Sequence, residues 1–339
     1  MKNKLTNAFL FIVIIVLMLI ISELGLRFAH HLTSEKEAES GLSTLLQKSE
    51  IPGLVWQLTP GFKSDKYQIN ASGFRGAEFP AAKDSAVQRI ACIGDSHCFG
   101  MGVYDDSRIY PSLLQAQLQK ISPVEVLNFG VPGYNTWQEF AQLENIVLNY
   151  APDFVVLGFF FNDADGNTAI ETASGRQKLG EQKNGPTSKS LSSWLKQSYL
   201  VMALKNGIER AGLALFDYHP NYIDLKIKSA RWQEMKNELA EMAEVLADRN
   251  IPLLVVVFPM TYQLAHPETV SAAQQDILSF LSEKKIEYIN LFPIFRRFLQ
   301  ANDFEYKKLI VKGIRDSHPT ATGHALVAEE IVKYMLNKK

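Results

Sequence analysis

Residues 90–102 read IACIGDSHCFGMG. The apolar run in this stretch ends at Gly94-Asp95-Ser96, and further glycines follow within a few positions. This pattern is typical of a buried strand that stops in a tight turn. Ser96 then either caps the next helix or stands at the edge of a sheet as a nucleophile. The stretch alone leaves both interpretations open.

Other apolar runs along the chain repeat this pattern. They lie at residues 124–130, 153–161, 252–259 and 286–292. Segments with helical periodicity separate them, which is typical of βαβ units around a parallel sheet buried on both faces. We therefore predict a flavodoxin-like, three-layer α/β/α domain with a central parallel sheet of about five strands. In such sheets, ligands bind beyond the carboxyl ends of the strands.

The composition excludes several classes of protein. With 339 residues, of which 47% are hydrophobic, the chain can bury a large core. Its 35 Lys and Arg residues balance 36 Asp and Glu residues, so nothing favours nucleic acid as a partner. Cys92 and Cys98 lack the spacing of a metal site, and we expect free thiols. No HExxH motif or carboxylate cluster occurs, so no metal or other cofactor is predicted.

The N-terminus predicts a membrane anchor over residues 1–28. The run from Leu5 to Ser22 carries no charge, and as a helix it would be about as long as a bilayer core is thick. Lys2 and Lys4 precede it, which favours a cytoplasmic N-terminus and an extracytoplasmic (periplasmic or extracellular) remainder. A cleaved signal peptide is the alternative, although no good A-x-A-type site follows.

The rest of the chain divides into two parts. Residues 29–85 predict a juxtamembrane stem, whose aromatic content is too high for a free linker and indicates packing on the next domain. Residues 86–339 predict that domain, with an insertion at about 163–225 that consists of a polar loop and an amphipathic helix. A lid and an inert surface insertion are both compatible with this insertion.

A nucleophilic serine needs a base, and the C-terminal histidines supply the candidates. His318 lies on a proline-containing turn just before a predicted helix, and Asp316 precedes it by two residues. A carboxylate there could hold His318 Nδ1 and leave Nε2 free to take a proton. Alternatively, the two residues could form a turn and a helix cap. His97 adjoins Ser96, but adjacent side chains on a turn usually diverge, and His324 suits a structural role.

Two further strand ends carry residues that suit an oxyanion site. Gly133 follows the second predicted strand in a glycine-rich turn, where a backbone N–H can approach a ligand closely. Asn162 follows the third strand, directly after a very apolar run. Both residues could equally serve a local turn. Because they lie at neighbouring strand ends, we expect them near Ser96.

Taken together, these motifs resemble those of the SGNH/GDSL hydrolase family. GDSHCFGMGV resembles its first block, NFGVPGYNT its second, GFFFND its third and DSHPTATGH its fifth. The resemblance covers roughly residues 86–339. The stretch INASGFRGAEF is also similar to one that precedes the first block in membrane-anchored members. The family commonly has its Asp three residues before the His, where this chain has Arg315.

The resemblance implies a serine esterase with a Ser96–His318–Asp316 triad and an oxyanion hole of Ser96, Gly133 and Asn162. The expected substrate is an ester-bearing small molecule, glycan or lipid of the cell envelope. Two alternatives stay open: an O-acyltransferase with the same site, and a non-catalytic envelope assembly or glycan-binding protein. Partner proteins are not predicted.

Overall fold

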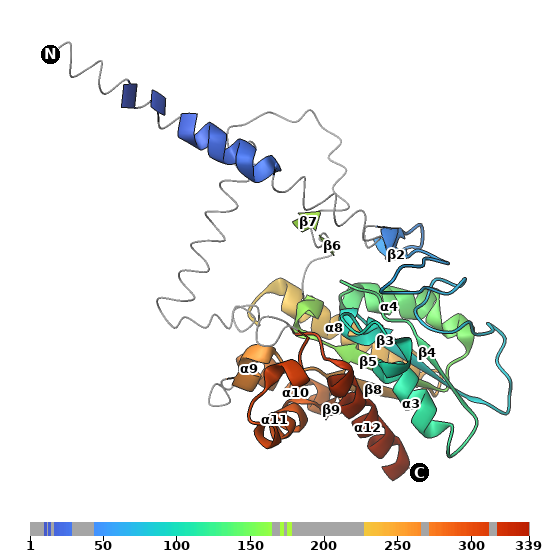
Figure 1. The fold of residues 1–339 in the computed structure, drawn as a ribbon. Helices are drawn as coiled ribbons and strands as arrows, with labels where there is room; N and C mark the ends of the chain where they lie inside the picture. The colour runs from blue at the N-terminus through green and yellow to red at the C-terminus, as the bar shows by residue number, and fades with distance from the viewer. Residues whose placement is uncertain are drawn as a thin grey trace. The chain divides into compact units, whose positions relative to one another are not determined.

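The computed structural model in Figure 1 describes most of the chain. The described residues are 10–11, 13–14, 17–28, 44–164, 170–172, 175–177, 227–265, 271–311 and 317–338. The chain divides into two compact units: Met1–Ser43 with Glu171–Pro220, and Thr44–Ile170 with Asn221–Lys339. Most of the predicted insertion at 163–225 lies outside the described residues, and so does Asp316.

The first unit contains the N-terminal segment. Residues 17–28 are helical, and Arg27 forms an ion pair with Glu23 at 2.8 Å on this helix. Among the described residues, no helix is both long and apolar enough to cross a membrane. Part of the predicted anchor, including residues 1–9, lies outside those residues.

The second unit is built on a parallel sheet of five strands, which confirms the predicted fold class. Its strands are β3 (Gln88–Gly94), β4 (Val124–Asn128), β5 (Phe154–Phe159), β8 (Leu253–Val257) and β9 (Glu287–Asn290). The spatial order is β4-β3-β5-β8-β9, so β5 is the central strand and β3 and β8 flank it. Four of these strands lie within the apolar runs of the sequence, and β3 begins two residues before Ile90. The runs are apolar because a strand covered on both faces has no polar side.

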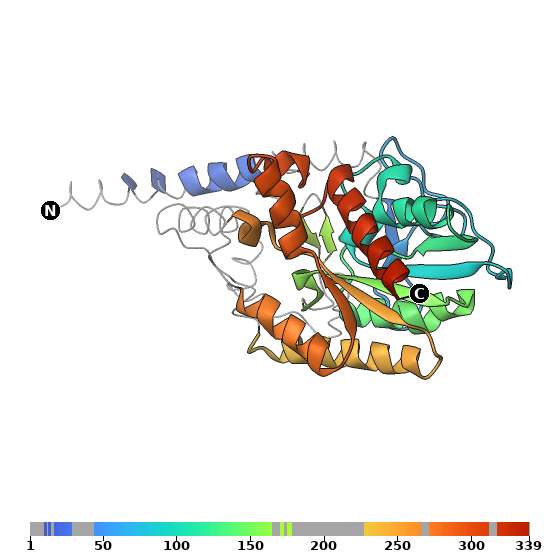
Figure 2. The ribbon, with the colours of Figure 1, turned by 90° about the horizontal axis from the view of Figure 1, so that it is seen from below.

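Helices cover both faces of this sheet (Figures 1 and 2). On one face, α4 (Thr136–Asn145), α8 (Ala230–Ala247) and α10 (Ala272–Glu283) pack against the odd-numbered side chains of β3 and β5. On the other face, α3 (Tyr110–Leu118), α11 (Phe292–Ala301) and α12 (Ala321–Asn337) pack against the even-numbered ones. The alternation follows from the two-residue period of a strand.

Shorter elements complete the described part of the chain. They are β1 (Leu46–Lys48), β2 (Trp56–Leu58), α2 (Ser96–Phe99), η2 (Asp106–Arg108), η3 (Val147–Tyr150), η4 (Phe161–Ala164), β6 (Ile170–Thr172), β7 (Gly175–Gln177), α9 (Thr261–Ala265) and η5 (Tyr306–Lys308). β1 pairs with β2 in antiparallel fashion, and β6 lies beside β7 in a separate two-stranded sheet.

Residues 44–86 pack on the sheet domain. Trp56 of β2 is buried, and its Nε1 donates to the carbonyl oxygen of Pro132 at 3.0 Å. The Tyr134 hydroxyl in turn donates to the Trp56 carbonyl oxygen at 2.7 Å. Phe74 is also buried and joins the core on the α4 side. This segment therefore braces the loop between β4 and α4.

Candidate active site

Ser96 stands at the end of an inner strand because the chain turns sharply after β3. Gly94 has φ +150°, and a Cβ there would lie 2.8 Å from the Cβ of Cys98 and 3.0 Å from the Gly158 carbonyl oxygen. Only glycine fits such a turn without strain. Ser96 begins the short helix α2, and its side chain is half-buried at the carboxyl edge of the sheet.

His318 meets Ser96 from the other end of the chain. Its Nε2 lies 2.9 Å from the Ser96 Oγ. The backbone around His318 is fixed on both sides: Val311 N donates to the His318 carbonyl at 3.0 Å, and Thr320 N donates to Leu309 O at 2.8 Å. With its proton on Nδ1, a neutral His318 ring can accept the Ser96 hydroxyl proton at Nε2.

Asn162 is the third predicted residue that the structure brings to this place. It lies in η4, directly after β5, and its Nδ2 donates to the Asp95 Oδ2 at 3.0 Å. The Ser96 Oγ lies 3.4 Å from the same carboxylate oxygen. Asn162 and Ser96 therefore flank one carboxylate oxygen.

Gly133 lies in the loop after β4. It has φ +80°, and a Cβ there would come within 3.3 Å of the Trp56 ring. The same loop is bound to the end of β3, because Val131 N donates to Gly94 O at 3.0 Å. The second strand end is thus held against the turn that carries Ser96, while Asp316, the predicted third triad residue, lies outside the described residues.

Asp95 is a site residue that the sequence analysis did not single out. It is fully buried, and it accepts hydrogen bonds from the His97 backbone N–H at 2.7 Å and from Asn162. Burial alone would raise the pKa of Asp95, but the charge and hydrogen bonds of His97, with the bond from Asn162, lower it. The carboxylate is therefore ionised. The only sequence signal for it was its place within the Gly-Asp-Ser turn.

The two remaining histidines near the site have other partners. His97 binds Asp95 and the Ser317 carbonyl, and no hydrogen bond to Ser96 is found for it among the described residues. His324 is buried in α12, where its Nδ1 accepts from Tyr110 N at 3.2 Å. Burial, followed by the charges of His97, Arg75 and His318, lowers the pKa of His324 to about 3. It is neutral, as its predicted structural role requires.

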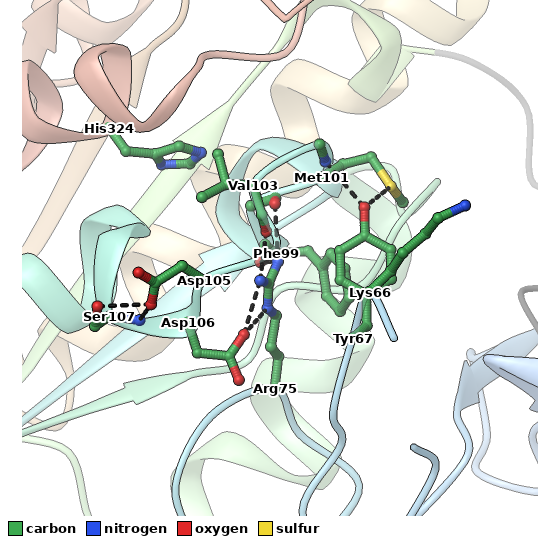
Figure 3. A network of polar contacts seen from close by, with 12 residues as sticks. Lys66, Tyr67, Arg75, Phe99, Met101, Val103, Asp105, Asp106, Ser107 and His324 are labelled. Atoms are coloured by element: carbon green, nitrogen blue, oxygen red, sulfur yellow. Dashed lines mark hydrogen bonds and ion pairs between the residues drawn. The ribbon is translucent and has the colours of Figure 1, made fainter. Parts of the chain in front are cut away.

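Arg75 holds the far end of the turn that follows Ser96 (Figure 3). Its guanidinium is fully buried, forms an ion pair with Asp106 at 2.7 Å and donates to the Gly100 carbonyl at 2.8 Å. It also donates to the carbonyl oxygens of Phe99 and Val103. Beside Arg75 in Figure 3, the Tyr67 hydroxyl donates a hydrogen bond to the Met101 sulfur.

No group of three or more His, Cys, Asp or Glu side chains that could hold a metal ion occurs in the described part of the chain. Cys92 and Cys98 are both buried and free, and burial raises the pKa of each thiol far above its ordinary value. Both thiols are therefore unreactive core groups at neutral pH.

The family model of the GDSL-like lipase/acylhydrolase family matches residues 92–326. The chain belongs to this family. No curated protein sequence is significantly similar to this GDSL-family chain.

Among solved structures, it is similar to a two-domain esterase (CEX) active on acetylated mannans and co-crystallized with mannopentaose. The two are 15% identical with a TM-score of 0.45, over 74% of this chain and 49% of that one. The GDSL-family chain thus spans about half the length of that esterase. It is also similar to the acetyl xylan esterase AlAXEase, with 17% identity and a TM-score of 0.45 over 73% and 98% of the chains. A putative lipolytic G-D-S-L protein from Desulfitobacterium hafniense DCB-2 shares 15% identity, with a TM-score of 0.41 over 71% and 96%.

Proposed function

We propose that this chain is a membrane-anchored serine esterase that hydrolyses an O-acyl ester of an envelope glycan or lipid. The observation that carries the proposal is the 2.9 Å contact between the His318 Nε2 and the Ser96 Oγ. A neutral imidazole at this distance can remove the hydroxyl proton as the oxygen attacks an ester carbonyl. The acyl group then passes to Ser96 and, in the second step, to water.

The oxyanion that forms in each step needs hydrogen-bond donors. We assign this role to the backbone N–H groups of Ser96 and Gly133 and to the side-chain amide of Asn162. One N–H of the Asn162 amide is bonded to Asp95, so its second N–H is available for the substrate. Asp316 is the proposed partner of the His318 Nδ1, where a carboxylate would stabilise the imidazolium that forms.

We propose that a hollow beside Thr320, two residues after His318, receives part of the substrate. It has a volume of about 290 Å³, and Tyr104, Asp105, Arg108 and Thr320 contribute to its lining. The Tyr104 side chain is 56% exposed. An aromatic face together with charged side chains suits a sugar ring better than a long acyl chain. We therefore favour an acylated glycan over a lipid.

The decisive experiment incubates the purified full chain, in detergent, with nitrophenyl esters of different acyl length, with and without sugar acceptors. We expect release of nitrophenol by the wild type and none above background by Ser96→Ala. A fluorophosphonate probe should label the wild type once and leave Ser96→Ala unlabelled. Acylated sugar as the main product would establish the O-acyltransferase alternative. A folded wild type that neither turns over an ester nor takes up the probe would leave the non-catalytic alternative.

The membrane anchor is tested separately. The uncharged run between Leu5 and Ser22, with Lys2 and Lys4 before it, would place the C-terminus outside the cytoplasm. A reporter fused after Lys339 should be active only in the extracytoplasmic compartment, and the chain should stay in the membrane fraction after a salt wash. A reporter active in the cytoplasm, or a mature chain that begins near residue 30, would contradict the anchor.

A further inference from the structure

His97 occupies a buried position between the nucleophile's strand and the loop of the base. Its side chain is 1% exposed. Its Nδ1 lies 3.1 Å from the Asp95 Oδ1, and its Nε2 lies 3.2 Å from the Ser317 carbonyl oxygen. These two contacts join segments that are 220 residues apart in the chain. The ring thus bridges the Gly-Asp-Ser turn and the residue that precedes His318.

The hydrogen-bond partners fix the protonation of this ring. A carbonyl oxygen only accepts, so the Nε2 that faces Ser317 carries a hydrogen. The Asp95 carboxylate oxygens already accept from two other N–H groups, so the Nδ1 that faces them also carries a hydrogen. An imidazole with hydrogens on both nitrogens is a cation.

The His97 ring is stacked on the ring of the proposed general base, His318. The ring centroids of His97 and His318 are 5.1 Å apart, and their planes differ by 27°. Phe160 and Phe258 also pack on the His97 ring, at centroid distances of 4.2 and 5.0 Å. These apolar rings exclude water, so the charge acts on His318 with little screening.

We infer that His97 is a positively charged positioning residue: its hydrogen bond to the Ser317 carbonyl holds His318 on Ser96, and its charge keeps His318 in the neutral, base-competent form. A positive charge near an imidazole disfavours a second positive charge on that imidazole. The inference rests on the proposed function of Ser96 and His318. It extends that function by giving His97 two separable tasks.

Other charged groups surround this histidine pair and do not replace His97. Asp95 is the counterion of His97 on the α2 side, and Arg75 from residues 44–86 is bound to carbonyl oxygens and to Asp106. From α4, Glu139 is buried, and burial with the nearby Asp95 and Glu238 raises its pKa well above the ordinary value. His324 of α12 is neutral. Asp316 would act on His318 with the opposite sign.

Two substitutions separate the tasks of His97. The side-chain amide of His97→Asn lies near the position of Nδ1 and keeps a donor for Asp95, whereas that of His97→Gln lies near Nε2 and keeps a donor for Ser317. Both lose the positive charge. The profile of kcat/KM for a neutral nitrophenyl ester against pH should therefore shift in both variants. We expect the rising limb to move to higher pH by about one unit.

The plateau rate should distinguish the variants. His97→Asn loses the bond to Ser317, so its plateau kcat should fall at least about tenfold, whereas His97→Gln should stay within about threefold of the wild type. His324→Asn is the matched control, because its amide oxygen can still accept from Tyr110 N and no charge is removed. Its rising limb should not move. If the rising limb of the pH profile stays at the wild-type pH in both His97 variants, the inference is overturned.

A measurement that needs no catalysis tests the inference independently of the proposed function. Nitrogen NMR of the wild type labelled in its histidine rings should show both nitrogens of His97 protonated at neutral pH, and the signal should disappear in His97→Gln. A neutral single tautomer at His97 would refute the inference even in an active esterase. Failure of the fluorophosphonate probe to label Ser96 would refute the proposed function and leave the NMR result standing.

Discussion

Asp95 organises the candidate site at the scale of single residues. An ionised carboxylate accepts hydrogen bonds and donates none, so the amide of Asn162 must turn its Nδ2 toward Asp95, at 3.0 Å. This contact fixes the orientation of the amide before a substrate binds. The second N–H of Asn162 then points away from Asp95. An amide held in this way stabilises an oxyanion without reorganising during the reaction.

Asn162→Ala should therefore lower kcat by about a hundredfold and leave KM for a small nitrophenyl ester nearly unchanged, because the lost hydrogen bond forms mainly in the transition state. Asn149→Ala is the control, since Asn149 is exposed on η3 and bonds only to its own helical neighbourhood. Steady-state kinetics on both variants, with unchanged circular dichroism, check this expectation. Near-normal kcat in Asn162→Ala would remove Asn162 from the oxyanion hole.

Asp316→Asn should change the pH profile in the direction opposite to the His97 variants. A general base works in its neutral form, so kcat/KM rises with pH and then levels off. Loss of a nearby negative charge lets His318 lose its proton at lower pH, so the rising limb should move to lower pH. The plateau should also fall, because the asparagine no longer stabilises the imidazolium. If the pH profile of Asp316→Asn has the same rising limb and the same plateau as the wild type, Asp316 does not belong to the triad.

At the scale of elements, residues 44–86 form a brace for the turn that carries Ser96. Arg75 in this segment is fully buried and bonds to three carbonyl oxygens and to Asp106 around the end of α2. A short helix of four residues has little stability of its own. Its geometry therefore depends on contacts such as these.

Arg75→Met should destabilise the domain by about 3 kcal/mol, because it leaves buried carbonyl oxygens and Asp106 without their partner. Arg75→Lys should rescue little of this loss, since one ammonium cannot reach acceptors on several sides. Arg231→Met serves as control: its ion pair with Glu234 is exposed, and its loss should cost less than about 1 kcal/mol. Urea unfolding measures all three. Equal stability of Arg75→Met and the wild type would show that the brace is dispensable.

The strands could be predicted from the sequence because each is marked by a local pattern of apolar residues. The five apolar runs marked all strands of the sheet, because strands buried on both faces need apolar residues throughout. Ser96, Asn162 and His318 follow from motifs at strand and loop ends. Asp95 and His97 do not, since their roles depend on partners 67 and 220 residues away. Likewise, no local pattern showed that Arg75 would reach the end of α2.

At the scale of the whole molecule, stability against pH depends on buried carboxylates. The face of α4 that meets the core carries Glu139, whose carboxylate oxygens have no hydrogen-bond partner among the described residues. Burial, with the nearby charges of Asp95 and Glu238, raises its pKa well above the ordinary value. Burial and the neighbouring Glu234 also raise the pKa of Glu238 in α8, to about 7. At a pH between its ordinary pKa and its raised pKa, each group holds a proton in the folded state that the unfolded chain has lost.

The sign of the resulting pH dependence follows from this difference. Above pH 4.5, the ordinary pKa of Glu139, the folded protein binds more protons than the unfolded chain. The free energy of unfolding therefore decreases as the pH rises through the range up to the folded pKa. Glu139→Gln replaces the carboxyl with a neutral amide of the same shape and removes this contribution. The variant should match the wild type below pH 4.5 and exceed its stability increasingly as the pH rises toward the raised pKa.

Urea unfolding at several pH values in this range measures the effect, with Glu50→Gln as the control at an exposed position. Glu238→Gln should show the same sign as Glu139→Gln, and its gain should approach a constant above about pH 7, where folded Glu238 has itself ionised. A wild-type slope that Glu139→Gln leaves unchanged would mean that this carboxylate ionises normally, and the buried face of α4 would then have to contain a partner for its charge.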